Sequence, residues 1–374
     1  MKKQHQKHPK LTRTQGDRYA RTDIALVGSS SEVIEPFIKQ WTEALATQFR
    51  SVAIISNNHQ PQAGSSWQQG AEQCSSPFAD WNEYDERIRR STYDVALVSG
   101  SHYFAPLQVV LIDQKYVDTL ERYREDLAEV IAVIRCPGTS QLPTWLKEHL
   151  AAAIHRPVVC KLEEATDTVL PLLFTLLSTR VPALNALILT GGESSRMCKR
   201  KADLVYRGGI TEAQRLARLT NEVVPGQVYI SVATAEQPTV DDFPNLADRF
   251  LSLGPAGAIA SAFLTEPDAA WLVVACDLPL LEISQLQQLI AARDSRQFAT
   301  AYRLAGSPFP EPLVAIYEPR AYMRFLQFLG LGYACPRKML MNSPIREIET
   351  IEKDAFFNAN TAEEREMVMG KLAR

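Results

Sequence analysis

The sequence has 374 residues, which is enough for two domains with hydrophobic cores of their own. Hydrophobic residues make up 46% of the chain and charged residues 22%, which excludes a disordered or fibrous protein. The formal net charge of -3 excludes a general attraction to nucleic acid or anionic membranes, so an anionic substrate must be held by local groups.

The N-terminal segment, residues 1–21, contains seven lysines and arginines, one acid and almost no large apolar side chain. We therefore expect a disordered basic tail, with polyanion binding as the alternative. No apolar run approaches the roughly 18 residues that span a bilayer. The six cysteines are scattered without metal-ligand spacing. We expect a cytoplasmic protein with free thiols and with neither membrane nor nucleic-acid partners.

Residues 22–162 are predicted to form an α/β domain with a doubly wound, mostly parallel sheet, because short apolar strands alternate with helical patterns. The polar segment 60–76 is predicted to be a long loop. The predicted strands are 24–28, 52–56, 94–100, 109–113 and 131–135, and the predicted helices are 33–49 and 117–129.

The first predicted strand ends at Gly28 and leads into a helix, which is where a P-loop would lie. A P-loop needs a Lys-Ser or Lys-Thr pair for the phosphates and magnesium. Here the turn continues Ser29-Ser30-Ser31-Glu32 and contains no lysine. Its serines can cap the helix or bind an anion weakly. We expect this P-loop-like domain not to hydrolyse nucleotide.

A helical linker is predicted at residues 163–182, and a second α/β domain at residues 183–374. The same alternation of strands and helices predicts a second doubly wound, mostly parallel sheet there. Strands are predicted at 183–189, 228–230, 271–276 and 314–317, and helices at 164–179, 280–290 and 321–329.

The turn after strand 183–189 contains the candidate reaction centre. Gly191 and Gly192 lie where open α/β sheets bind ligands, and without a Cβ they let backbone N–H groups approach a nucleotide. Arg196 and Lys201 follow with fixed positive charge. Phosphoryl transfer depends mostly on positioning and charge neutralisation, so Arg196 and Lys201 are predicted to be catalytic.

Two aspartates are further candidates. Asp277 ends the apolar strand 271–276, so its carboxylate is expected at the same sheet edge, where one or two carboxylates suffice for Mg²⁺. Capping of the next helix is the alternative. Cys276 is expected to point the other way, into the core. Asp248 precedes a Gly-Pro pair that opens a helix, and a role as a turn residue is one interpretation of this position; a second follows from the family resemblance described below.

Polar residues near the C-terminus are candidates for binding a second substrate. Asn358 and Asn360 alternate in an extended segment, so both amides can reach one ligand, with a local turn role as the alternative. Thr361 is expected to cap the last helix. Arg337 and Lys338 can hold a substrate phosphate, although most such pairs are solvated.

Together these motifs resemble the molybdenum cofactor guanylyltransferases, whose pattern is Leu-Ala-Gly-Gly-x-Ser-x-Arg-Met-Gly-x-Asp-Lys-Ala. The matching positions are Leu189, Gly191, Gly192, Ser194, Arg196, Met197, Lys201 and Ala202. The resemblance implies a Rossmann-like nucleotidyltransferase fold and transfer of GMP from GTP to molybdopterin, with Mg²⁺ on Asp277. The binding residues that it implies are Leu189, Thr190, Gly191, Gly192, Lys201, Ser231, Asp248, Asp277, Asn358 and Asn360.

In arrangement alone, the first domain resembles the P-loop adaptor domain that partners this transferase. That resemblance implies a docking or scaffold role, with molybdoenzymes or cofactor-synthesis proteins as partners.

Two positions depart from the family pattern: Cys198 replaces a glycine and Arg200 replaces an aspartate. A cysteine in a left-handed conformation would cost roughly 1–2 kcal/mol, and Arg200 adds like charge beside Lys201. Three hypotheses therefore stay open. They are guanylyl transfer to molybdopterin, the same fold acting on CTP or a sugar phosphate, and an impaired nucleotide-binding or assembly protein.

Overall fold

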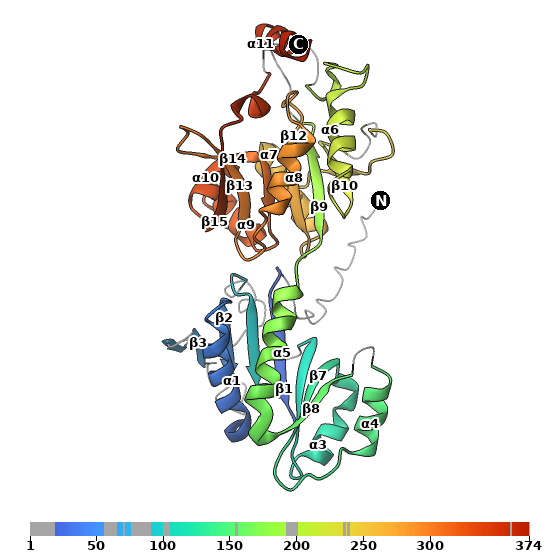
Figure 1. Ribbon diagram of the computed structural model, residues 1–374, viewed down its shortest axis with the longest axis vertical. Helices are drawn as coiled ribbons and strands as arrows, with labels where there is room; N and C mark the ends of the chain where they lie inside the picture. The colour runs from blue at the N-terminus through green and yellow to red at the C-terminus, as the bar shows by residue number, and fades with distance from the viewer. Residues whose placement is uncertain are drawn as a thin grey trace, which may run out of the picture. The chain divides into compact units, whose positions relative to one another are not determined.

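The computed structural model divides into two compact units, unit 1 (Met1–Arg180) and unit 2 (Val181–Arg374). Each unit contains a sheet flanked by helices (Figure 1), which confirms the predicted α/β class. The residues that the structure describes are 19–55, 66–69, 72–75, 91–99, 105–153, 156–191, 201–234, 237, 240–359 and 361–373.

The sheet of unit 1 is mostly parallel. Its strands are β1 (Thr22–Val27), β2 (Ser51–Ile55), β3 (Ser66–Gln69), β4 (Glu72–Ser75), β5 (Val95–Ser99), β6 (Leu107–Ile112), β7 (Glu129–Arg135) and β8 (Val158–Lys161). Their order in the sheet is β4-β3-β2-β5-β1-β6-β7-β8. Neighbouring strands from β2 to β8 in this order are parallel, whereas β3 is antiparallel to both β2 and β4.

Helices cover both faces of this sheet because alternate strand residues point to opposite sides. The helices are α1 (Ser31–Leu45), α3 (Val117–Arg122), η1 (Arg124–Asp126), α4 (Thr144–Ala151), η2 (Leu162–Glu164) and α5 (Ala165–Thr179). On one face, α1 and α5 bury Ile38 and Leu173 in a cluster with Leu26 of β1 and Leu111 of β6. On the other face, α3 and α4 pack against the alternate residues of β6 and β7.

Three features of unit 1 differ from the predictions. Part of the expected loop 60–76 forms a hairpin of β3 and β4, because backbone pairing does not require apolar side chains. Arg21, expected in the disordered tail, is buried, and its Nε atom lies 2.6 Å from Oδ1 of Asp23. The rest of the predicted tail, residues 1–18, lies outside the described residues. Helix α5, expected to be a linker, buries Val169 in the core of unit 1.

The sheet of unit 2 combines parallel strands with one antiparallel strand. Its strands are β9 (Leu184–Leu189), β10 (Val228–Val232), β11 (Asn245–Ala247), β12 (Ala270–Ala275), β13 (Ala299–Leu304), β14 (Pro310–Tyr317) and β15 (Ile345–Thr350). Their order in the sheet is β11-β10-β9-β12-β14-β13-β15. Strands β11, β10, β9 and β12 are parallel, β14 is antiparallel to its neighbours β12 and β13, and β15 is parallel to β13.

Helices cover both faces of this sheet as well. The helices are η3 (Lys201–Asp203), α6 (Glu212–Asn221), α7 (Gly254–Thr265), α8 (Ile283–Ala291), α9 (Ala321–Gly330), α10 (Pro336–Met341), η4 (Lys353–Phe356) and α11 (Ala362–Leu372). Helices α6 and α8 pack on the face that carries Val274. Tyr317, which pairs with Trp271, points to the opposite face and contacts Phe325 of α9, and α9 stacks on α7.

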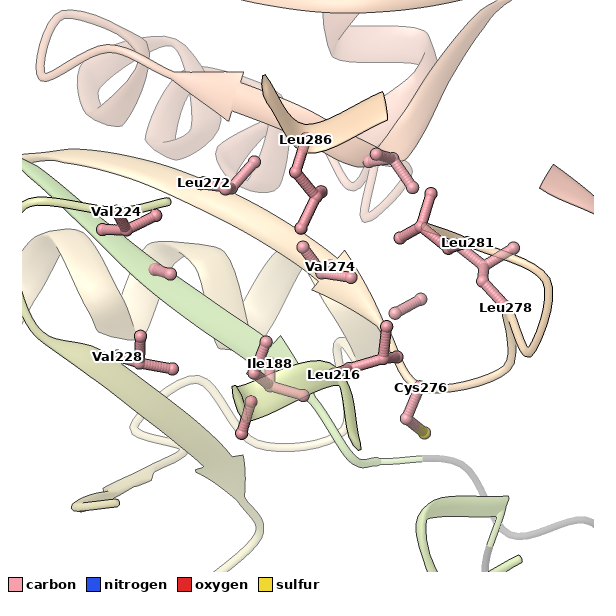
Figure 2. Close-up of a cluster of buried hydrophobic side chains, with 14 of the residues drawn as sticks. Ile188, Leu216, Val224, Val228, Leu272, Val274, Cys276, Leu278, Leu281 and Leu286 are labelled. Atoms are coloured by element: carbon pink, nitrogen blue, oxygen red, sulfur yellow. The ribbon is translucent and has the colours of Figure 1, made fainter. Parts of the chain in front are cut away.

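The core of unit 2 extends beyond the sheet into the turn that follows β12. Figure 2 shows Cys276, Leu278 and Leu281 in the same cluster as Leu216 of α6 and Ile188 of β9. The prediction that Cys276 belongs to the core is confirmed, since its side chain is buried. Apolar side chains therefore anchor the turn that carries Asp277.

Candidate active site

The candidate active site is the edge of the unit 2 sheet where β9, β10, β11 and β12 end together. The register sets Leu189 of β9 beside Ser231 of β10 and Ala275 of β12. The chain passes from β9 outward to β10 and β11, and then returns to β12 on the other side of β9. Open α/β sheets bind ligands at the carboxyl ends of strands where the order reverses in this way.

Of the turn after β9, the structure describes Thr190 and Gly191, and of these two residues the exposed one is a glycine, which offers only backbone to a ligand. Leu189 is buried, and its carbonyl oxygen accepts a hydrogen bond from the N–H of Cys276 at 3.1 Å. The hydroxyl of Thr190 donates to the carbonyl oxygen of Ser231 at 2.5 Å, and both residues are buried. Gly191 is exposed, and a Cβ built on it would meet no described atom within 4 Å.

Several predicted site residues of this segment cannot be placed. Gly192, Arg196, Cys198 and Arg200 lie outside the described residues, and of Lys201 only the backbone, in η3, is described. Their roles remain predictions from the sequence.

Asp277 lies two residues beyond the end of β12, after Cys276, and its side chain is half-buried at the same edge. The alternative that it caps the next helix is wrong, because α8 begins at Ile283 with Glu282 at its N-cap. The carbonyl oxygen of Asp277 accepts a hydrogen bond from the N–H of Ala359 at 3.2 Å. This bond joins the β12 turn to the C-terminal segment, which is distant in sequence.

The C-terminal segment thereby brings one predicted amide to the site. Asn358 is exposed and precedes the residue that bonds to Asp277, whereas Asn360 lies outside the described residues. The hydroxyl of Thr361 accepts a hydrogen bond from the N–H of Glu364, which confirms the predicted cap of α11. A small buried cluster holds this segment against the chain that follows η3, and its members are Leu204, Tyr206, Ala359 and Val368.

Asp248 follows β11 and is partly buried beside β10. Its N–H donates to the carbonyl oxygen of Val232 at 2.9 Å, which fixes its backbone at the edge of the sheet. Its Oδ1 atom is buried and has no hydrogen-bond partner among the described residues. Burial raises the pKa of Asp248 from 3.8 to about 6. A buried acceptor without a partner is costly, so a ligand that donates a hydrogen bond would stabilise this position.

A second carboxylate near Asp277 was missed from the sequence. Burial raises the pKa of Glu311 in β14, and the negative charge of Asp277 raises it further. Arg337 lies 3.8 Å from Glu311. The antiparallel register of β12 and β14 pairs Val274 with Val314. Extended by three residues beyond that pair, the same register places Asp277 opposite Glu311. Only the strand pairing, which sequence patterns do not provide, carries this signal.

The corresponding turn of unit 1 is closed by contacts within the protein. Gly28 has φ +95°, and a Cβ built on it would lie 2.2 Å from the carbonyl oxygen of Leu111. The hydroxyl of Ser29 donates to a carboxylate oxygen of Asp113 at 2.8 Å. Ser30 occupies the N-cap of α1 but makes no side-chain cap bond, contrary to the expected capping role. A carboxylate bonded in this turn is unfavourable for phosphate, because the two charges have the same sign.

Comparison with known proteins identifies the family. Residues 186–345 match the MobA-like NTP transferase domain. The chain is 30% identical to the molybdenum cofactor guanylyltransferase of Xanthomonas euvesicatoria pv. vesicatoria, over 47% of this chain and 89% of that protein. The chain belongs to the molybdenum cofactor guanylyltransferase family. It is thus a member of a family of nucleotidyltransferase enzymes.

Two further similarities concern a longer protein and a solved structure. The chain is 34% identical to the molybdenum cofactor biosynthesis bifunctional protein of Synechocystis sp., over 48% of this chain and about half, 52%, of that protein. Molybdopterin-guanine dinucleotide biosynthesis protein A from Archaeoglobus fulgidus is 18% identical, with a TM-score of 0.43 over 50% of this chain and 98% of that one. Among the helices that the structure describes, none has the length and hydrophobicity to cross a membrane.

Proposed function

We propose that unit 2 transfers GMP from GTP to molybdopterin, forming the guanine dinucleotide cofactor and pyrophosphate. The observation that carries this proposal is that Gly191, Asp248 and Asp277 all follow strands at the same carboxyl edge of the sheet, in a member of this transferase family. The open backbone at Gly191 would contact the nucleotide, and the buried Oδ1 of Asp248 would accept a hydrogen bond from it.

The reaction would be an in-line displacement without a covalent enzyme intermediate. An oxygen of the acceptor's terminal phosphate attacks the α-phosphorus of GTP. The bond from that phosphorus to the oxygen bridging to the β-phosphate breaks, and its electron pair leaves with pyrophosphate. Lys201 and Arg196 would neutralise charge on the triphosphate and the leaving group, which is the main requirement of phosphoryl transfer.

Asp277 is the proposed ligand for Mg²⁺. Its side chain is half-buried at the strand ends, and within the described ranges no group of three His, Cys, Asp or Glu side chains is arranged for a metal ion. A single carboxylate fits Mg²⁺, which usually keeps several waters and takes one or two carboxylates together with substrate phosphates. When bound, the cation would neutralise charge on the triphosphate. The backbone hydrogen bond between Asp277 and Ala359 would hold the main chain that carries this carboxylate in place.

The acceptor would bind on the side of β14 and the C-terminal segment. Asn358 and Asn360 would hydrogen-bond molybdopterin, and Arg337 would attract its phosphate. The exposure of Asn358 and Arg337 supports this role. For unit 1, with its closed turn, we propose docking of a molybdoenzyme or cofactor-synthesis protein without nucleotide hydrolysis.

A transfer assay tests the proposal. The full chain is incubated with molybdopterin, Mg²⁺ and either GTP or CTP, and the dinucleotide product is separated by chromatography. We expect product from GTP and its loss when Mg²⁺ is chelated. Product from CTP alone would contradict the guanylyl assignment.

The departures at Cys198 and Arg200 support a second candidate, an impaired nucleotide-binding or assembly protein. The double variant Cys198→Gly/Arg200→Asp restores the family pattern at both positions. Activity in the parent chain contradicts this candidate, whereas activity that emerges only in the double variant contradicts the transferase proposal for the natural chain.

A further inference from the structure

The turn that carries Asp277, here called the Asp277 loop (residues 277–281), is held by two arginines outside it. Arg215 of α6 donates to the carbonyl oxygens of Leu278 at 3.1 Å and Leu281 at 2.9 Å. Arg207 donates to the carbonyl oxygen of Pro279 at 3.2 Å. Three backbone acceptors of a loop without helix or strand are thereby bonded to guanidinium groups.

Arg215 is itself fixed by a buried acid. Glu212, one turn earlier on α6, is 1% exposed, and both of its carboxylate oxygens accept from Arg215 at 2.5 to 3.0 Å. A guanidinium group has five N–H donors in one plane, so one edge can bind a carboxylate while the others bind carbonyl oxygens. Lysine has no such planar fork. The pair therefore joins α6 to the Asp277 loop in one orientation.

The free energy of folding alone does not explain why Arg215 and Glu212 are buried together. Buried ion pairs are often no more stable than apolar residues of similar volume. Leu216, which follows Arg215 on α6, and the two loop residues that Arg215 bonds, Leu278 and Leu281, belong to the buried apolar cluster of unit 2 (Figure 2). An apolar pair could fill the same space, but it could not bond the loop carbonyls.

We propose that Arg215, oriented by Glu212, is a positioning residue that sets the Asp277 loop so that the Asp277 carboxylate meets a metal-bound nucleotide. The inference rests on the proposed function, since it assumes that Asp277 binds the cation. Arg215 bonds the carbonyl oxygen of Leu278, the residue after Asp277, and the N–H of Ala359 donates to the carbonyl oxygen of Asp277 itself. Groups that orient a metal ligand typically change metal affinity about 10–100-fold when removed.

The test separates metal-dependent from metal-independent nucleotide binding. GTP is titrated into the full chain by calorimetry, once with Mg²⁺ and once with EDTA, and thermal unfolding is recorded. The double variant Glu212→Leu/Arg215→Met removes both charges together, and Arg215→Lys keeps the charge but removes the fork. Arg218→Met is the matched control, because Arg218 lies on the same helix and pairs with Asp241 at the surface.

We expect the parent and Arg218→Met to bind GTP more tightly with Mg²⁺ than with EDTA. In the double variant and in Arg215→Lys, the gain from Mg²⁺ should fall at least about tenfold, whereas affinity in EDTA stays unchanged. A folded variant of either kind that keeps the full gain would overturn the inference. Absence of any gain in the parent would overturn the proposed function, and this inference with it.

Discussion

Both units have a glycine in the turn after their first strand, Gly28 directly after β1 and Gly191 two residues beyond the end of β9, and the two glycines differ in what surrounds them. Gly28 has a positive φ and lies against the backbone of Leu111, whereas a Cβ on Gly191 would meet none of the atoms that the structure describes within 4 Å. Beside Gly28, Ser29 is bonded to the carboxylate of Asp113. The comparison teaches that a glycine at the ligand edge of a sheet can serve close packing or ligand access, and that its neighbours decide which.

The largest effect on the rate of nucleotidyl transfer is expected from a comparison of two aspartates that follow sheet strands, Asp277 in unit 2 and Asp113 in unit 1. Asp277→Ala should lower the rate of nucleotidyl transfer on the order of 100- to 1000-fold, because electrostatic stabilisation of the transferring phosphate is lost. Asp113→Ala should leave the rate unchanged. Steady-state assays of both variants check this, and equal losses in the two would remove the functional distinction between the units.

The next contrast substitutes the glycines themselves. Gly28→Ala should destabilise unit 1 by about 2–4 kcal/mol, because the Cβ meets the carbonyl of Leu111 and φ is positive. Gly191→Ala should fold normally but bind GTP more weakly. Urea unfolding and GTP titration measure the two effects. A Gly191→Ala protein with undiminished GTP affinity would count against backbone contact at that turn.

Asp248 should make the free energy of unfolding of unit 2 depend on pH. Its pKa in the folded protein, about 6, lies above the usual 3.8, so the folded state holds this proton more tightly than the unfolded chain. Relative to Asp248→Asn, the free energy of unfolding of the parent should be highest below about pH 4 and fall as the pH rises to about 6. Urea unfolding from about pH 4 to pH 7 checks the trend, and parallel curves for the two proteins would refute it.

The smallest effect concerns helix caps. Thr361→Ala should cost about 1 kcal/mol, because it removes the hydrogen bond from the N–H of Glu364 at the start of α11. Ser30→Ala at the start of α1 should cost less, since Ser30 makes no such bond. Hydrogen exchange of the two first helical turns compares them. A larger loss of protection in α1 than in α11 would show that the caps are misassigned.

Much of the fold follows from local patterns in the sequence. Apolar runs predicted β1, β9 and β12, and the Thr361 cap predicted the start of α11. Polar strands such as β3 and β4 could not be predicted, because they form by backbone pairing at an edge. The same limit applies to the site. The position of Asp277 and Asp248 at the sheet edge could be predicted from strand ends, whereas the positions of Glu311 and Arg215 depend on pairing and packing across distant segments.

The central claim, that nucleotide binds at the edge of unit 2 and not at the turn of unit 1, is tested most directly by hydrogen exchange of the full chain with and without GTP and Mg²⁺. We predict slower exchange in residues 189–191 and 277–281, with no change in residues 28–34. Slower exchange in residues 28–34 alone would contradict the account.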